Sequence, residues 1–317
     1  MYGAIRTGDG SLLYGWIVSA HRHAGDSVVR HLESAGAPAI SEQNGPAEII
    51  TLWPDKVVRA PGDTLADRPF MLLYLPPKNL STGAAALVFA GGAYNHIAIV
   101  KEGLPAARWL NSIGVAAFVV RYRLGPVYHH PAMLQDAARA MRVARTRANE
   151  WGIDPARIGV VGFSAGGHLA STLATRSDRG NSTSADFVER AGSRPAFVLL
   201  VYPVITMKEP FVNRGSRRDL LGVAPDSAEI EQLSNELHVA SDLAPTFLVA
   251  ATDDPGVPVE NSLLFYNSAR SAAVPVELHL FQAGGHGFGL APDNPALSAW
   301  PALAAAWLRR NGWLGAR

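Results

Sequence analysis

Residues 160–170 read Val-Val-Gly-Phe-Ser-Ala-Gly-Gly-His-Leu-Ala, and this stretch decides the fold. An apolar, β-branched run leads into Ser164, and a segment with helical spacing follows it. Glycines occupy positions 162, 166 and 167 around the serine. Small neighbours allow a strand to turn sharply into a helix while the serine is held in a strained conformation. The stretch therefore predicts a strand–turn–helix unit with the Ser164 hydroxyl at the carboxyl end of a buried strand.

Short apolar runs continue this pattern from about residue 46 onward, and most are continuous, as is typical of strands buried on both faces. The predicted strands are 48–53, 70–75, 85–90, 115–123, 157–163, 196–204, 246–252 and 276–281. The predicted helices are 103–113, 131–150, 165–176, 259–273 and 296–310. Such alternation predicts a doubly wound, mostly parallel α/β sheet of about eight strands with helices on both faces. The first two strands, with no helix between them, predict an antiparallel edge.

Two regions interrupt this alternation. Residues 1–45 are mixed in character, and we interpret them as an N-terminal extension to an α/β domain over 46–317. Within the extension, the apolar run 12–18 resembles a short secretory signal, but its length favours a surface segment and a cytoplasmic protein. A secreted or periplasmic location is the alternative. Residues 205–243 form a long insertion between two strands, which predicts either a cap over a site or a solvated excursion.

Composition excludes several classes of partner and site. The 317 residues include 28 basic and 27 acidic side chains, for a net charge of +1. This balance creates no field for nucleic acid or an anionic membrane, and no apolar run reaches the ~18 residues of a membrane span. The chain has no cysteine, which excludes thiolate metal ligands and cysteine nucleophiles. We expect no nucleic-acid or membrane partner, and the oligomeric state stays open.

Two further loops supply groups that could activate Ser164, since a serine is a weak nucleophile without a base in reach. His286 lies in AGGHGFG (283–289) after the last predicted strand, and Asp253 and Asp254 end the preceding strand. Adjacent parallel strands bring these loops to one edge, and the order serine, aspartate, histidine is that of α/β-hydrolases. The pattern predicts Ser164 as nucleophile, His286 as base and one of the two aspartates as the orienting acid.

Backbone amides near Ser164 are candidates for an oxyanion site. Gly91 and Gly92 follow the predicted strand 85–90 and allow the chain to turn its amides inward. Ala165 stands at a predicted helix N-terminus, where amides lack partners. We expect the amides of Gly92, Ala93 and Ala165 to stabilise a developing oxyanion. A plain turn is the alternative for the glycine pair.

Two side chains after this loop are candidates for the wall of a substrate pocket. Tyr94 and His96 follow the glycine pair directly. Core packing for Tyr94 and solvation for His96 are the alternatives. His129 and His130 precede a predicted helix and are weaker candidates for the same wall.

These segments together resemble the α/β-hydrolase superfamily, and more closely the bacterial esterases that include acetylxylan esterases and feruloyl esterase-like enzymes. The resemblance runs from about residue 46 to the end of the chain. Its motifs here are LWPDK, AGGAYNHIA, KEG, AARWLNSIGVAAFVVRYRLGP, YHHPAMLQDAARA, EWGIDPARIGVVGFSAGGHLAS, LVYPVI, PTFLVAATDDPGVPVENS and GGHGFGL. The resemblance implies that 46–317 is a catalytic domain that needs neither a metal nor an organic cofactor.

The resemblance also bears on individual residues. Relatives place the catalytic acid eight residues before the serine of a V-P-x-x-x-S segment, here Ser262, which selects Asp254 with Asp253 as the alternative. The triad implied is Ser164, Asp254 and His286. Where lipase-like relatives carry His-Gly-Gly-Gly, this chain has Ala-Gly-Gly-Ala at 90–93.

The activity implied is hydrolysis of short-chain acyl esters, acetyl above all, on a small molecule or a carbohydrate such as xylan. A feruloyl esterase is one alternative. A peptidase of the prolyl-oligopeptidase type shares the triad order, but its propeller domain cannot fit in the 45 residues before the α/β region. A non-catalytic binding protein of the same fold is a third alternative, although such proteins usually lose a triad residue.

Overall fold

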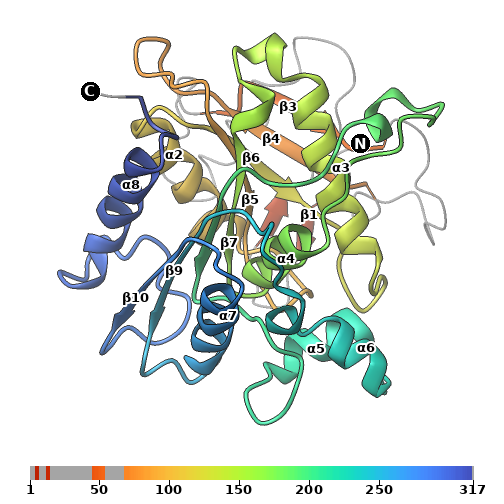
Figure 1. Cartoon of the computed structure of the whole chain (residues 1–317), viewed down its shortest axis with the longest axis vertical. Coiled ribbons are helices and arrows are strands. Elements are labelled where there is room, and N and C mark those ends of the chain that lie inside the picture. The colour runs from red at the N-terminus through yellow and green to blue at the C-terminus, as the bar shows by residue number, and fades with distance from the viewer. Residues whose placement is uncertain (1–3, 7–11, 15–44, 54–67, 316–317) are drawn as a thin grey trace.

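The computed structural model describes residues 4–6, 12–14, 45–53 and 68–315 (Figure 1). The predicted N-terminal extension, including most of the apolar run 12–18, therefore lies largely outside the described residues. Within it, β1 (Ala4–Arg6) and β2 (Leu12–Tyr14) pair as a separate antiparallel ladder.

An eight-stranded sheet forms the centre of the described chain (Figure 1). Its strands are β3 (Glu48–Thr51), β4 (Phe70–Tyr74), β5 (Ala85–Phe89), β6 (Ala116–Arg121), β7 (Ile158–Phe163), β8 (Val198–Val201), β9 (Thr246–Ala251) and β10 (Val276–Phe281). Their spatial order is β10-β9-β8-β7-β5-β6-β4-β3. Strand β4 runs antiparallel to both β3 and β6, and the other pairs are parallel. The predicted sheet, its size and its antiparallel edge are confirmed.

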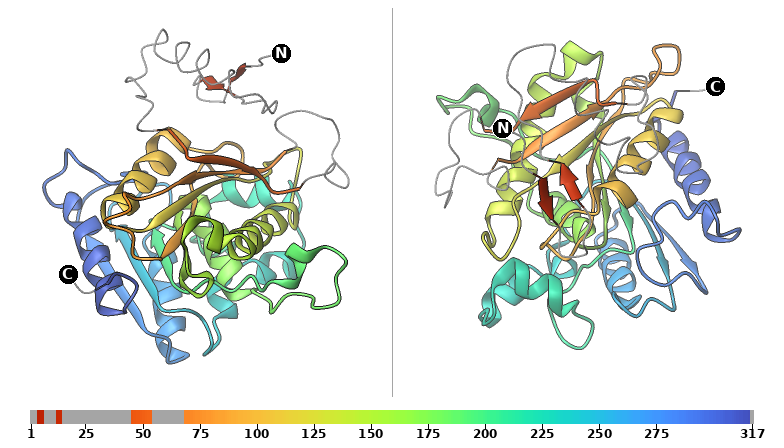
Figure 2. Two further views of the ribbon diagram at one scale, coloured as in Figure 1. Left: turned by 90° about the horizontal axis from the view of Figure 1, so that it is seen from above. Right: turned by 180° about the vertical axis from the view of Figure 1, so that it is seen from behind.

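Helices cover both faces of this sheet (Figure 2). Helices α2 (Leu104–Ser112) and α8 (Trp300–Arg310) pack on one face, while α3 (Ala132–Thr146), α4 (Ser164–Thr175) and α7 (Glu260–Ser271) pack on the other. Alternate residues of β5 enter different cores, with Leu87 under α3 and α4 and Val88 under α2. This burial on both faces explains why the strands are continuously apolar in sequence.

Several predicted helices begin or end at other residues than expected. The predicted helix 131–150 ends at Thr146, and Ala148–Trp151 forms a separate 3₁₀ turn. A π-helical turn, η3 (Ile99–Gly103), precedes α2. The predicted helix 296–310 becomes regular only at Trp300, where a proline occupies the first turn and loses no hydrogen bond there.

The insertion 205–243 contains helices that the sequence pattern did not predict. They are α5 (Arg214–Leu221), α6 (Ser227–Gln232) and the short turn η7 (Asn235–His238). Figure 1 shows α5 and α6 together at one end of the molecule, below α4. A capping box, in which Asp226 and Glu229 exchange hydrogen bonds, begins α6.

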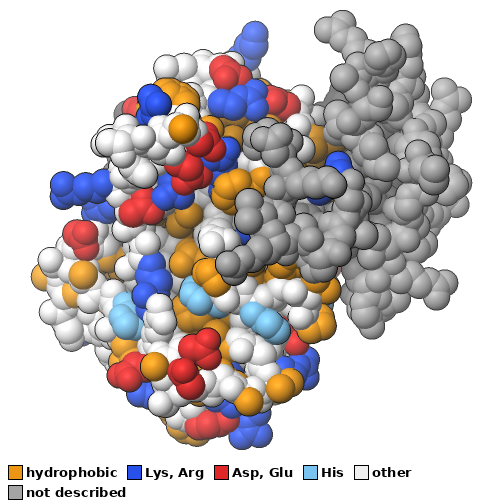
Figure 3. All heavy atoms as spheres, turned by 90° about the vertical axis from the view of Figure 1, so that its right-hand side faces the viewer, with side chains coloured by type: hydrophobic (Ala, Val, Ile, Leu, Met, Phe, Trp, Pro, Cys, Tyr) orange, Lys and Arg blue, Asp and Glu red, His pale blue; other side chains and the backbone are white. Residues whose placement is uncertain are grey.

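The surface does not divide into regions of opposite charge on the face that Figure 3 shows, where basic and acidic side chains are interspersed. No helix among the described residues combines the length and the apolar character needed to cross a bilayer.

Close packing of α4 on the sheet explains the glycines around Ser164. A Cβ at Gly166 would lie 2.1 Å from the carbonyl oxygen of Phe89, and one at Gly162 would lie 2.4 Å from the carbonyl oxygen of Gly166. A Cβ at Gly167 would lie 2.7 Å from Pro203. Any side chain at these positions would force the helix away from the strands.

We expect Gly166→Ala to lower the free energy of unfolding by about 1–3 kcal/mol or more, because the new methyl overlaps backbone that cannot move without distorting β5. Urea unfolding followed by circular dichroism measures the change. Gly45→Ala is the matched control, since a Cβ there has no atom of the described residues within 4 Å, and it should leave the midpoint unchanged. An unchanged midpoint for Gly166→Ala would contradict this account of the packing.

Candidate active site

Ser164 occupies the sharp turn between β7 and α4. It is the first residue of α4, and its φ of 51° lies in the left-handed region that non-glycine residues rarely adopt. Its carbonyl oxygen accepts the Val204 amide at 3.0 Å, and its side chain is almost buried. Surrounding structure must therefore hold the strained serine, as the sequence predicts.

The Ser164 hydroxyl meets the imidazole of His286, which in turn meets Asp254. The Ser164 Oγ to His286 Nε2 distance is 2.8 Å, and the His286 Nδ1 to Asp254 Oδ2 distance is 2.7 Å. An ionised carboxylate only accepts hydrogen bonds, so the proton of the neutral ring sits on Nδ1. Nε2 is then free to accept the serine proton, which is the arrangement that a general base needs.

The two neighbouring aspartates make different contacts. Asp254 is buried, and its second oxygen, Oδ1, accepts the amides of Gly256 and Val257 at 2.8 Å each. Asp253 is exposed, and its Oδ1 accepts the amides of Gly284 and Gly285 at 2.8 Å each. The structure thus brings Asp254 to His286, whereas Asp253 binds the backbone of Gly284 and Gly285, just before this histidine.

The glycine pair after β5 lies directly against Ser164. A Cβ at Gly91 would stand 2.7 Å from the Cβ of Ser164. The next residues adopt positive φ: 127° at Gly92, 49° at Ala93 and 64° at Tyr94. No acceptor among the described residues takes the amides of Gly92 or Ala93. These amides and that of Ala165, at the start of α4, are therefore available to an oxygen bound beside Ser164.

The Tyr94 side chain does not line an open pocket. Its ring is buried, and its hydroxyl bonds His168 Nδ1 at 2.8 Å. The Leu233 carbonyl takes the proton of His168 Nε2 at 2.8 Å, so Nδ1 accepts from the tyrosine. The structure therefore favours the core-packing alternative for Tyr94: the ring bonds a buried acceptor, and only the Tyr94 backbone belongs to the loop after β5. His96 is half-buried and bonds Asn95 Oδ1.

Two buried polar residues near the site are not singled out by the sequence pattern. His168 lies on α4, and burial lowers its pKa to about 4. Glu102 lies in η3, and burial raises its pKa, while hydrogen bonds from Gly91 and Tyr202 act in the opposite direction. In the sequence, His168 stands out only as a basic residue in a run of small and apolar residues, and Glu102 only as the acid of the KEG motif. Neither pattern predicts the hydrogen bonds that these side chains make with Tyr94, Leu233 and Tyr202, which lie far away in the chain.

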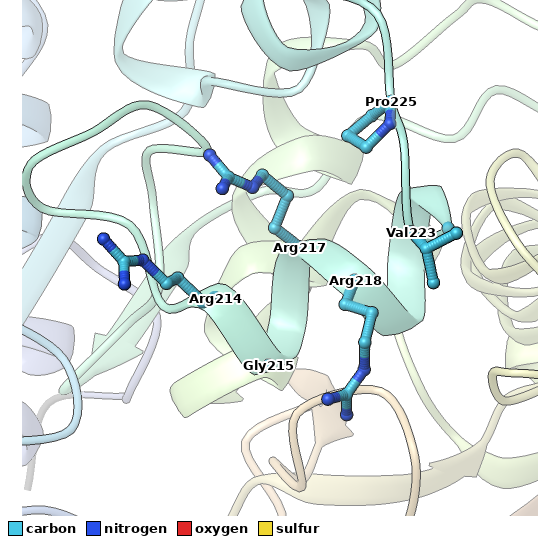
Figure 4. A pocket seen from close by; sticks show the side chains of 7 residues that line it. Arg214, Gly215, Arg217, Arg218, Val223 and Pro225 are labelled. Atoms are coloured by element: carbon cyan, nitrogen blue, oxygen red, sulfur yellow. The ribbon is translucent and has the colours of Figure 1, made fainter.

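A pocket of about 300 Å³ opens on α5 rather than at Ser164 (Figure 4). Its lining residues are Arg214, Gly215, Arg217, Arg218, Gly222, Val223 and Pro225. The guanidinium groups of Arg214 and Arg217 extend to one side of the helix and that of Arg218 to the other. Glu209 forms ion pairs with Arg214 and Arg217, and Asp219 pairs with Arg218. Carboxylates of the chain itself therefore neutralise these arginines. No cluster of three or more His, Asp or Glu residues in the described part of the chain is placed to bind a metal ion.

The model of the BD-FAE family matches residues 71–268, more than half of the chain. The chain belongs to the BD-FAE family. A crystal structure of an acetyl ester-xyloside bifunctional hydrolase from Caldicellulosiruptor lactoaceticus matches this family member with a TM-score of 0.81 and 42% identity, covering 87% of this chain and 100% of that one. The predicted α/β-hydrolase fold and the resemblance to the acetylxylan esterase group are confirmed.

Two curated relatives are similar over part of their length. The acetylxylan esterase of Xylanibacter ruminicola is 35% identical over 223 residues, which cover 69% of this chain and 43% of that protein. The endo-1,4-beta-xylanase B of Butyrivibrio fibrisolvens is 35% identical over 219 residues, which cover 68% and 34% respectively. The matched region spans less than half the length of either relative.

We expect the His168 ring to stay neutral from pH 8 to about pH 5, because burial holds its folded pKa near 4, below the ordinary 6.5. Its contribution to stability, of order 3 kcal/mol, is full above pH 6.5 and is lost as the pH falls towards 4. The ring C–H shifts in an NMR titration measure this directly, with free histidine as the reference. A midpoint near 6.5 would contradict the buried, neutral assignment.

Proposed function

We propose that this BD-FAE family member is a serine carboxylester hydrolase that removes short acyl groups, acetyl above all, from a carbohydrate such as xylan. The observation that carries the proposal is the contact series from Ser164 Oγ through His286 to Asp254, with distances of 2.8 and 2.7 Å. Support for the substrate comes from relatives named as an acetylxylan esterase and an acetyl ester-xyloside hydrolase.

In the first half of the proposed mechanism, Ser164 Oγ attacks the ester carbonyl carbon while His286 Nε2 takes the serine proton. Asp254 keeps the ring oriented and stabilises the imidazolium that forms. The carbonyl oxygen becomes an oxyanion and receives hydrogen bonds from Ala165 and from Gly92 or Ala93. The carbon–oxygen bond to the alcohol then breaks, and His286 gives its proton to the departing alkoxide, which leaves an acyl-serine.

Water reverses this sequence in the second half. His286 takes a proton from a water molecule as the water oxygen attacks the acyl carbon. The same amides stabilise the second oxyanion. The bond to Ser164 Oγ breaks, the serine regains its proton from His286, and the acid is released.

The insertion 205–243 is proposed to cap the site and to limit the acyl group. Its contacts support this role, since they reach both sides of the Ser164 turn. Asn213 Nδ2 donates to the Gly256 carbonyl at 2.8 Å, beside the Asp254 loop. Asn95 Nδ2, in the loop after the glycine pair, donates to Asp219 Oδ2 at 3.1 Å.

We expect Ser164→Ala to lower kcat for 4-nitrophenyl acetate by at least about 10⁴-fold, because no other group can form the acyl intermediate. Asp254→Asn should lose about as much, since the ring would adopt the wrong tautomer. Stopped-flow or steady-state release of nitrophenol measures both. Asp253→Asn is the matched control and should lose far less. Equal losses in the two asparagine variants would contradict the choice of acid, and an active Ser164→Ala would contradict the mechanism.

We expect turnover of 4-nitrophenyl esters to fall steeply beyond about four acyl carbons, because a short pocket rejects longer chains by steric overlap. Acetate release from acetylated xylan should exceed ferulate release from methyl ferulate, measured by chromatography of the acids. A flat chain-length profile would argue against a short pocket. Faster ferulate release would favour the feruloyl esterase alternative, and a protein inert towards every ester would favour a binding role.

A further inference from the structure

Glu102 is a buried carboxyl beside the site that the proposed mechanism leaves without a role. It lies in η3 and is only 4% exposed. Its Oε2 accepts the Gly91 amide at 2.6 Å, and its Oε1 accepts the Tyr202 hydroxyl at 3.0 Å. Burying a carboxyl is costly unless its oxygens are satisfied, and here both are.

The hydrogen bond from the Gly91 amide to Glu102 fixes the point at which the loop after β5 touches Ser164. Gly91 approaches the serine so closely that its Cβ would stand 2.7 Å from that of Ser164 and 2.9 Å from the carbonyl oxygen of Phe163. Its amide is held by Glu102, and its carbonyl oxygen accepts the Ala98 amide at 2.9 Å. The position of Gly91 therefore sets where the following amides of Gly92 and Ala93 lie.

The second bond connects the same carboxyl to the segment after His286. The Tyr202 oxygen accepts the Gly289 amide at 2.9 Å, and its hydroxyl donates its proton to the Glu102 carboxylate, which can only accept. The Tyr202 ring packs edge-on against His286 with centroids 5.1 Å apart. The Glu102 carboxyl thus connects the loop that begins at Gly91 to the segment around Gly289, which follows His286.

The chemistry of this junction requires two acceptors. The Gly91 amide can only donate, and the Tyr202 hydroxyl donates to Glu102 because a carboxylate can only accept. A carboxylate accepts on both oxygens, whereas a glutamine offers one acceptor and one donor. A glutamine at 102 would therefore satisfy one of the two groups and oppose the other.

We propose that Glu102 is a positioning residue that holds the loop of Gly91, Gly92 and Ala93 against Ser164 and, through Tyr202, ties this loop to the segment carrying His286. The inference rests on the proposed function, since it needs an oxyanion to form at Ser164.

The test is Glu102→Gln, assayed with 4-nitrophenyl acetate and with a boronic acid that forms a tetrahedral adduct on Ser164 Oγ. We expect kcat to fall roughly tenfold to hundredfold, less than outright loss of an oxyanion donor costs, with KM little changed. Affinity for the boronic acid should fall by a similar factor, because its oxygen uses the same amides as the transition state. A merely structural role would not move inhibitor affinity and kcat together.

Tyr202→Phe provides the matched second variant. It keeps the ring against His286 and the Glu102–Gly91 bond, and it removes one of the two donors that face Glu102. We expect a several-fold loss of kcat from this variant alone. Adding Glu102→Gln to Tyr202→Phe should lower kcat much less than Glu102→Gln does in the wild-type protein, because the Gly91 amide is then the donor left facing residue 102 and the single glutamine oxygen can accept it. This non-additivity is the signature of a shared link.

Glu277→Gln is the control for the loss of an acid that holds two partners, because Glu277 is half-buried in β10, where it pairs with His279 and Arg310. It should keep the wild-type kcat. A wild-type kcat in Glu102→Gln, a change in KM alone, or unchanged boronic acid affinity would overturn the inference. If Glu102→Gln does not fold, a wild-type kcat in Tyr202→Phe would overturn it. An active Ser164→Ala would instead overturn the proposed function itself.

Discussion

The rest of the structure depends on how the backbone of Ser164 is held. With a φ of 51°, the serine turns β7 into α4 and directs its hydroxyl to the carboxyl edge of the sheet. Such a conformation costs about 1–3 kcal/mol and persists only where neighbours leave no alternative. The glycines that let α4 approach β5 provide that packing, and the Val204 amide holds the serine carbonyl.

Hydrogen-bond direction organises the groups around this turn. On one side, the carboxylate of Asp254 orients His286 so that its free nitrogen faces Ser164. On the other, the carboxyl of Glu102 receives the Gly91 amide and the Tyr202 hydroxyl. Both acids are buried and act by accepting, and neither touches the place where a substrate carbonyl would lie. Two buried acceptors thus hold the loops on either side of the serine.

Tertiary contacts also explain why individual side chains depart from their expected roles. Tyr94 follows the glycine pair, as a pocket residue would, yet its hydroxyl finds His168 in the core. The insertion 205–243 shows little regular spacing of apolar residues, so its sequence does not indicate that the Leu233 carbonyl accepts a hydrogen bond from the same histidine. Because these partners are more than sixty residues apart, neither pairing can be read from local spacing.

The sequence by itself determined the α/β class, the antiparallel edge and the three loops that meet at Ser164, because apolar runs and glycine spacing are local consequences of strand burial and tight turns. Sequence also selected Asp254 over Asp253, though only through resemblance. The tertiary structure decided which carboxylate reaches His286, where the Tyr94 ring lies and what Glu102 binds. Each of these depends on distances between loops, which are set by the packing of helices on the sheet and leave no periodic pattern in the chain.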